Sequence, residues 1–127
     1  SDVSSFPKIK EKTSVLIAAD DSIKNIKDAI NIINNKLSDL IILKPLWIGG
    51  IINSLKIIKL AKENNIDCIV SSVFESNIGK RVNVFMSSLL ENNYACGLST
   101  NEFFSNNIDE DFYPIKNGFI EFSNLNL

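Results

Sequence analysis

The sequence predicts an α/β fold made of parallel βα units, because two kinds of segment alternate along the chain. Short apolar runs rich in β-branched residues, at 14–20 (SVLIAAD) and 39–44 (DLIILK), are separated by a longer segment of helical periodicity. The first run ends on Asp20 and the second on Lys44. Reactive groups of parallel βα folds gather at the carboxyl ends of strands, so we expect this carboxylate and ammonium to act on one small ligand.

The N-terminal part is expected to begin with a short helix. Ser4 or Ser5 would cap it, Pro7 is tolerated in its first turn, and it would reach about Lys12. After the first strand we expect a second helix, capped by Ser22. The apolar stripe of that helix consists of Ile23, Ile26, Ile30, Ile33 and Leu37.

The middle of the chain repeats this pattern. The second strand leads through a glycine pair, Gly49 and Gly50, into a helix expected over 51–64. A third strand is predicted at 67–72 (DCIVSS) and a further helix at 76–91. The apolar face predicted for the helix at 51–64 consists of Ile51, Leu55, Ile58 and Ala61.

Toward the C-terminus the predicted elements become shorter. Residues 94–99 (YACGLS) predict a fourth strand, 101–107 a loop or weak helix, and 113–122 a hairpin closed by an Asn-Gly turn. No linker divides the chain, so we expect one domain over 1–127. A sheet of four parallel strands has two unpaired edges, so the domain is either an open doubly wound sheet or half of a closed barrel.

The charge balance excludes some classes of function. The 127-residue chain has a formal net charge of −2, which gives no basic field for nucleic acid. No apolar stretch approaches the roughly 18 residues of a membrane span, and the polar N-terminus lacks a signal-peptide core. We therefore expect a cytoplasmic protein that binds neither nucleic acid nor a membrane.

The side-chain inventory also limits the chemistry. Histidine is absent, so a metal ion would be held mainly by oxygen, and acid–base work would fall to Lys, Asp, Glu, Tyr or Cys. Cys68 and Cys96 have no zinc-like spacing, and we expect both to be reduced core residues. Purely structural roles stay open: Asp20 with Asp21 and Ser22 can cap a helix, and Lys44 can be a surface lysine.

Four segments, taken in order, resemble the enolase superfamily. Residues 17–23 (IAADDSI) resemble its fifth barrel strand, 43–51 (LKPLWIGGI) its sixth, 70–79 (VSSVFESNIG) its seventh, and 94–100 (YACGLST) its eighth. The similarity runs from about 15 to 122 and is greatest to the C-terminal barrel half of o-succinylbenzoate synthases, in the muconate-cycloisomerase branch. This resemblance favours the half-barrel, as the last part of a TIM-type barrel ending in a short hairpin.

The resemblance implies an Mg²⁺-assisted carbon–oxygen lyase of menaquinone biosynthesis. Such an enzyme abstracts a proton next to a carboxylate, passes through an enediolate and eliminates hydroxide. Asp20 would be a magnesium ligand, and Lys44 the catalytic cation facing the substrate. Asp21, where glutamate is usual, would belong to the outer surroundings of the metal, and Ser99 replaces a common aspartate.

The resemblance also suggests how the small-molecule carboxylate substrate is held. Ser71 and Ser72 would contact its carboxylates, together with the backbone around Gly49 and Gly50. Glu75 would orient the loop after the third strand by bonding backbone amides.

Other parts of the family's site are absent from this sequence. In the family, two further metal acids and a Lys-x-Lys base come from earlier strands. Lys8-Ile9-Lys10 has the right letters but lies in a predicted helix, so it is not assigned that role. We therefore expect the 127 residues alone to be inactive, and their open sheet edges to pair with a missing N-terminal half or with a second copy.

Several alternatives stay open at this point. A dipeptide epimerase or a muconate cycloisomerase would share the superfamily. A phosphoacceptor receiver domain also has paired acids after its first strand, as at Asp20 and Asp21, but it needs an aspartate after its third strand, where this chain has serine. A noncatalytic half-barrel that assembles with a partner chain is the remaining possibility.

Overall fold

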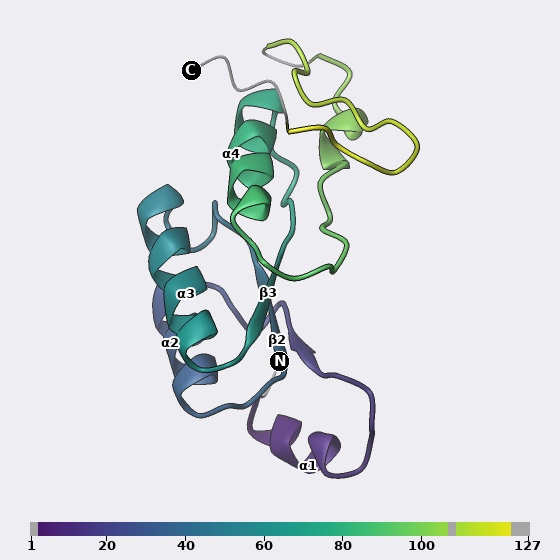
Figure 1. The fold of residues 1–127 in the computed structure, drawn as a ribbon. Coiled ribbons are helices and arrows are strands. Elements are labelled where there is room, and N and C mark those ends of the chain that lie inside the picture. Colours follow the sequence, from purple (N-terminus) through teal and green to yellow (C-terminus); the bar gives the residue numbers. More distant parts are fainter. Residues whose placement is uncertain (1–2, 107–108, 123–127) are drawn as a thin grey trace.

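The computed structural model describes residues 3–106 and 109–122 (Figure 1). Helices and strands alternate along the chain, as the sequence predicts. The elements are the 3-10 helix η1 (Val3–Ser5), α1 (Phe6–Lys10), β1 (Ala18–Ala19), α2 (Ile26–Asn34), β2 (Leu40–Leu43), α3 (Ile51–Glu63), β3 (Asp67–Val70), α4 (Asn77–Ser88) and the 3-10 helix η2 (Thr100–Phe103).

The three strands form one parallel sheet in the order β1-β2-β3. Ala19 pairs with Ile41, and Ile41 pairs in turn with Cys68. Because the strands are parallel and sequential, each connecting helix crosses back over the sheet, and the carboxyl ends of all three strands share one edge. The predicted α/β class with parallel βα repeats is confirmed.

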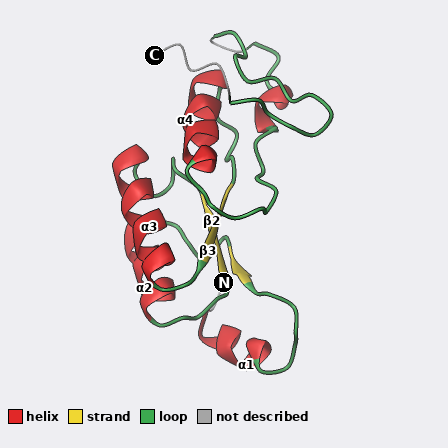
Figure 2. Cartoon of the chain, viewed as in Figure 1, coloured by secondary structure: helices red, strands yellow, loops and turns green. Residues whose placement is uncertain are grey.

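The two faces of the sheet differ. Ile41, Leu43 and Val70 are completely buried on the face that α2 and α3 cover, side by side (Figures 1 and 2). Their neighbours Ile42 and Ile69 point to the other face and are only half buried. An apolar sheet face left half exposed is what a barrel interior looks like when only part of the barrel is present.

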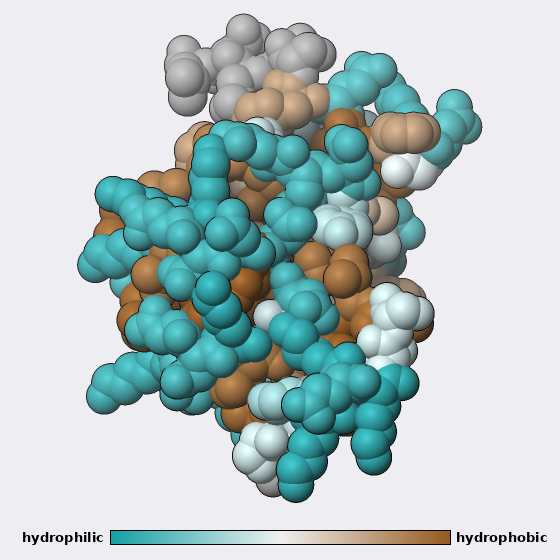
Figure 3. Space-filling model, turned by 60° about the horizontal axis from the view of Figure 1, so that its bottom comes forward, coloured by the Kyte–Doolittle hydropathy of each residue, from teal (hydrophilic) through white to brown (hydrophobic). Residues whose placement is uncertain are grey.

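The first strand is shorter than predicted. The run 14–20 forms a strand only at Ala18–Ala19, and Val15 and Leu16 are 70% and 52% exposed. Within the described residues β1 pairs only with β2, so its other edge has no strand to hold it. Figure 3 shows apolar patches interrupting the polar surface of one face of the molecule.

The prediction that Ser22 caps the second helix is wrong. Asn25 caps α2, and its Oδ1 accepts hydrogen bonds from the backbone N–H groups of Lys27 (2.9 Å) and Asp28 (3.2 Å). Asp28 reaches back to the N–H of Lys24 at 2.9 Å, so the two side chains satisfy the helix start reciprocally. Residues 20–24 form the turn that separates β1 from this helix.

The predicted helix faces are only partly right. In α2 the stripe residue Ile30 lies at the exposed boundary, whereas Ala29 and Ile32 are buried. In α3 the predicted positions Ile51 and Leu55 are 40% and 38% exposed. The buried face of α3 consists of Ser54, Ile57 and Ala61. Ser54 can lie inside because its hydroxyl donates to the carbonyl of Gly50 at 2.9 Å.

The described residues of the C-terminal part form little regular structure. The predicted strand at 94–99 is reduced to a single parallel bridge between Gly97 and Ser71. The hairpin turn is present: Lys116 and Phe119 form an antiparallel bridge, and Asn117 and Gly118 have φ of 53° and 81°. Residue 107, the end of the predicted loop or weak helix, lies outside the described residues. Among the described residues, no helix has the length and apolar character needed to cross a membrane.

Candidate active site at the carboxyl ends of β1 and β2

Asp20 and Lys44 meet at one edge of the sheet. Asp20 follows the last residue of β1 and Lys44 follows the last residue of β2, and these strands are parallel neighbours. The Lys44 Nζ lies 2.6 Å from the Asp20 Oδ1. The two strand ends therefore bring a carboxylate and an ammonium into direct contact, as their positions in the sequence predict.

Lys44 is much less accessible than the acids around it. Its side chain is 10% exposed, whereas those of Asp20 and Asp21 are 51% and 80% exposed. Burial by itself would lower the pKa of Lys44, but hydrogen bonds to Asp20 and Asp21 outweigh it and the pKa is raised. The lysine is thus held as a cation at the base of a site whose acidic side faces solvent.

Asp21 also contacts Lys44: its Oδ1 accepts a hydrogen bond from the Lys44 Nζ at 3.1 Å. Its predicted place in the outer surroundings of the metal stays a prediction. One ammonium is therefore shared by two carboxylates, and the cluster carries one negative charge in excess. That excess favours binding of a further cation.

Trp47, for which packing and no site role was predicted, also belongs to this cluster. The Lys44 Nζ lies 4.4 Å from the centroid of the Trp47 ring, within the range of a cation–π interaction. The available signal was the Lys-Pro-Leu-Trp string at 44–47, because a turn there folds the fourth residue back over the first.

The donor set suits magnesium only in part. Asp20 and Asp21 supply hard carboxylate oxygens on the exposed side of the site, which is the ligand type that Mg²⁺ prefers. The described residues contain no group of three or more Asp, Glu, His or Cys side chains able to hold a metal ion. Asp20 and Asp21 could therefore supply some of the oxygen ligands of a metal site, but the described residues do not provide a full ligand set.

The glycine pair shapes the loop beside Lys44. Gly49 and Gly50 have φ of 91° and 87°, a region that favours glycine. A Cβ on Gly49 would lie 2.8 Å from the Asn53 Nδ2, so a side chain there would displace a neighbour. The Gly50 N–H donates to the Pro45 carbonyl at 2.8 Å and is already used within the turn. The predicted contact between this backbone and a substrate stays a prediction.

Ser71 and Ser72 continue β3 toward the same edge. Their N–H groups donate to the carbonyls of Leu43 (2.9 Å) and Gly97 (2.8 Å), which fixes this backbone between β2 and the C-terminal segment. The Ser72 hydroxyl accepts a bond of 3.4 Å from the Asn83 Nδ2. The predicted role of both serines in substrate binding stays a prediction.

Glu75 bonds within its own loop. Its Oε2 accepts the backbone N–H of Val73 at 2.9 Å, and its side chain packs against Gly79 so closely that a Cβ there would come within 2.3 Å of the Glu75 Cβ. These contacts are of the loop-orienting kind that the sequence predicts for Glu75.

The Lys8-Ile9-Lys10 string lies away from the cluster. Lys10 forms an ion pair of 2.8 Å with Asp39, which precedes β2 and so lies at the opposite end of that strand from Lys44. The N–H of Ile17, together with Lys10, lowers the pKa of Asp39. This pair holds the N-terminal helix near the amino-terminal end of β2.

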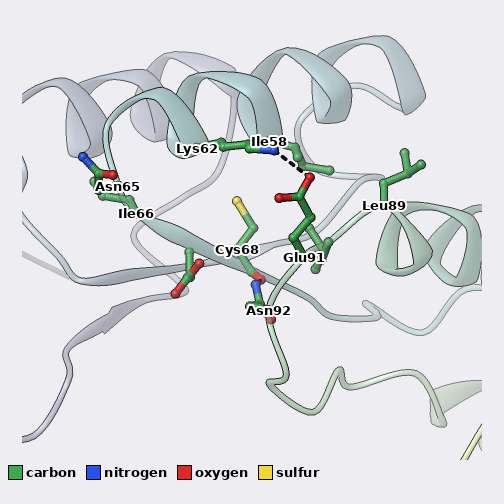
Figure 4. Close-up of a pocket in the computed structure, with 10 residues that line it drawn as sticks. Ile58, Lys62, Asn65, Ile66, Cys68, Leu89, Glu91 and Asn92 are labelled. Atoms are coloured by element: carbon green, nitrogen blue, oxygen red, sulfur yellow. Dashed lines mark hydrogen bonds and ion pairs between the residues drawn. The ribbon is translucent and has the colours of Figure 1, made fainter.

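A second hollow, beside the start of β3, is shown in Figure 4. An ion pair of 2.6 Å between Lys62 and Glu91 crosses it. Cys68 in its wall is buried as predicted, and burial together with the charge of Asp67 raises the pKa of its thiol to about 12. A thiol with such a pKa is a poor nucleophile at neutral pH, which leaves this hollow without a reactive group of that kind. Cys96 is only half buried.

With this geometry in place, comparison with known proteins settles the family. The family model for the enolase C-terminal domain matches residues 1–125. The chain belongs to the enolase C-terminal domain-like family. The receiver alternative is therefore set aside, and the fold of this enolase-family chain is that of part of a TIM-type barrel.

Relatives and solved structures agree with this assignment. An o-succinylbenzoate synthase from Thermobifida fusca is 33% identical over 99 residues, covering 77% of this chain and 30% of the relative. The L-Ala-D/L-Glu epimerase from Bacillus subtilis superimposes with a TM-score of 0.83 at 21% identity, over 94% of this chain and 33% of that one. A dipeptide epimerase from Cytophaga hutchinsonii, complexed with Mg and D-Ala-L-Val, gives a TM-score of 0.74 at 27% identity, over 83% and 28%. This enolase-family chain thus spans about a third of the length of the proteins it matches.

Proposed function

We propose that these residues form one side of the active site of an o-succinylbenzoate synthase-like dehydratase, in which Asp20 is a magnesium ligand and Lys44 is a catalytic cation. The observation that carries the proposal is the contact of 2.6 Å between the Lys44 Nζ and the Asp20 Oδ1 at the shared edge of β1 and β2. It rests further on the 33% identity to the Thermobifida fusca synthase.

Lys44 would stabilise the anion that forms when a proton leaves the carbon next to the substrate carboxylate. Its ammonium is withdrawn from water, with its side chain 10% exposed, so its charge acts more strongly than it would in bulk solvent. Asp20 and Asp21 keep it protonated, which an electrostatic role requires. Ser71 and Ser72 would orient the substrate from the neighbouring strand end, and the loop with Gly49 and Gly50 would supply backbone contacts.

Asp20 would hold Mg²⁺ together with ligands that the described residues do not provide. When bound, the ion would neutralise the negative charge developing on the substrate carboxylate. Glu75 would support the loop that follows β3. The proposed partner is a small carboxylate molecule, and the half-exposed sheet face would be covered by further barrel strands or by a second copy of the chain.

The test joins this chain to the part of the Thermobifida fusca relative that it does not match, and measures formation of o-succinylbenzoate. We expect turnover, and a loss of about 100-fold or more in Asp20→Asn and in Lys44→Met. Lys59→Met is the matched control, because Lys59 is 79% exposed and forms only a loose pair of 3.9 Å with Glu63. Turnover that survives both site substitutions would refute the assignment, and turnover by the 127 residues alone would refute their expected inactivity.

Dipeptide epimerisation is the second candidate within the family. It is favoured by the similarity to the Cytophaga hutchinsonii enzyme, at 27% identity. An epimerase removes and returns a proton at the same carbon, so it exchanges the α-hydrogen of a dipeptide in D₂O, whereas the dehydratase does not act on that substrate. Proton NMR of L-Ala-L-Glu incubated with the same fusion protein distinguishes the two activities.

A further inference from the structure

Trp47 is a large apolar side chain that stays 41% exposed although the turn carrying it is firmly anchored. Its neighbours Pro45 and Ile48 are buried. The N–H of Trp47 donates to the Lys44 carbonyl at 3.0 Å, and the N–H of Gly50 donates to the Pro45 carbonyl at 2.8 Å. Proline at the second position presets the φ that such a turn requires. The backbone alone therefore brings Trp47 back toward Lys44.

The indole and the carboxylates hold the ammonium in different ways. Asp20 and Asp21 bind it through ion pairs of 2.6 Å and 3.1 Å, and the Trp47 ring lies 4.4 Å away. A divalent cation at the site would compete for the carboxylate oxygens but not for the face of an indole. Without the indole, the flexible lysine stem would be held only by Asp21 once Asp20 changed partner, and Asp21 is itself a carboxylate that a metal ion can bind.

We propose that Trp47 is a positioning residue, which keeps the Lys44 ammonium at the carboxyl end of β2 whether or not Asp20 is bonded to it. The inference rests on the proposed function in one respect: that function explains why Lys44 must stay in place while Asp20 binds a metal ion. The contact itself can be tested without turnover.

The experiment measures the NMR shift of the Lys44 ε-CH₂ protons in the full 127-residue chain. An aromatic ring at this distance shifts protons above its face upfield, and Trp47 is the only tryptophan in the sequence. Loss of the signal in Lys44→Arg assigns it. We expect an upfield shift for Lys44, its loss in Trp47→Leu, and partial recovery in Trp47→Phe, whose smaller ring keeps a π-face.

The deciding variant is Asp20→Asn, which removes the closest negative charge and imitates an Asp20 engaged elsewhere. We expect the Lys44 protons to keep at least half of their upfield shift in this variant and in Asp20→Asn combined with Asp21→Asn. A return to the position of the exposed Lys59 signal would overturn the proposal, because it would mean that the carboxylates alone hold the lysine. If Trp47→Leu fails to fold, the shift in the wild-type chain and in Asp20→Asn still decides.

This outcome is independent of the substrate assignment. A retained shift together with an inactive fusion protein would uphold the role of Trp47 and reject the proposed function. A lost shift in Asp20→Asn together with an active fusion protein would do the reverse. If the fusion protein is active, Trp47→Leu is expected to lower kcat by about 3- to 30-fold with a smaller change in KM. Trp47→Phe should recover part of the lost kcat.

Discussion

Two lysines of this chain are withdrawn from solvent and paired with aspartates, but their surroundings differ. The side chain of Lys44 is 10% exposed, and its partners Asp20 and Asp21 are 51% and 80% exposed. The side chain of Lys80 is 2% exposed, and its partner Asp111 is 30% exposed. The acidic side of the first cluster is open to water, whereas the aspartate of the second is less exposed and its lysine is fully buried.

In the Lys80 cluster the single carboxylate also accepts hydrogen bonds from neutral groups. Asp111 accepts from the Lys80 Nζ at 2.8 Å, from the Asn101 Nδ2 at 3.2 Å and from the N–H of Tyr113 at 3.0 Å. One cation meets one carboxylate, and the remaining acceptor sites are taken by amides. This cluster fastens the C-terminal segment to α4, across 31 residues of sequence.

The comparison separates a structural ion pair from a candidate site by charge balance. At Lys80 the charges cancel and the ammonium is buried, so the pair contributes to holding the fold together. At Lys44 two carboxylates share one ammonium, and the excess negative charge lies where a ligand can reach it. The stability of the chain should therefore depend on the pair of Lys80 and Asp111, and ligand binding on the cluster around Lys44.

The largest effect is expected for Asp111→Ala. It leaves the Lys80 ammonium buried without a counter-charge, which should lower the free energy of unfolding by about 3 kcal/mol. Urea-induced unfolding followed by circular dichroism measures the change. Lys80→Met combined with Asp111→Leu should recover most of the loss, since replacing both partners by apolar groups removes the unpaired charge. A loss below about 1 kcal/mol in Asp111→Ala would mean that the Lys80 pair stabilises the fold no more than a surface ion pair does.

A smaller effect is expected from acid. Burial tends to raise the pKa of Asp111, but the hydrogen bonds from Lys80 and the Tyr113 N–H outweigh it, and the pKa is lowered. Because the folded-state pKa is below the unfolded one, this contribution to stability is present above the unfolded value and is lost as pH falls through the folded value. The free energy of unfolding of the wild-type chain should therefore fall between about pH 5 and pH 2.

Asp111→Asn should flatten part of that decline, because the amide does not titrate. Asp39 has a lowered pKa too, through the N–H of Ile17 and Lys10, so adding Asp39→Asn should reduce the remaining slope further. Urea titrations at several pH values give both slopes. An unchanged slope in Asp111→Asn would contradict this prediction, because it would mean that the pKa of Asp111 does not differ between the folded and unfolded states.

The contact between Asp20 and Lys44 was easier to predict from the sequence than the pair of Lys80 and Asp111. Asp20 and Lys44 each end an apolar run, and parallel strands place such residues at one edge without further information. Lys80 and Asp111 lie in a helix and in an irregular segment, and no periodicity relates two such positions 31 residues apart. Their pairing depends on tertiary packing alone.

The errors in the predicted elements have local causes. The apolar run at 14–20 indicates a strand but cannot tell how many of its residues find a pairing partner, and only Ala18–Ala19 do. Ser22 and Asn25 are both good capping residues, and the choice was decided by Asp28, three positions after Asn25. That reciprocal pattern was readable from the sequence and was missed.

The smallest effect on stability is expected for Lys44→Met. When the ammonium is removed, Asp20 and Asp21 are left partly hydrated instead of buried, so the free energy of unfolding should fall by less than about 1 kcal/mol. The measurement is the same urea titration, with Lys59→Met as the exposed control, for which almost no change is expected. A loss as large as that of Asp111→Ala would break the distinction drawn between the two lysines, because Lys44 would then be holding the fold together. A small loss in stability, combined with loss of turnover in the fusion protein, is the pattern of a residue whose charge serves a ligand.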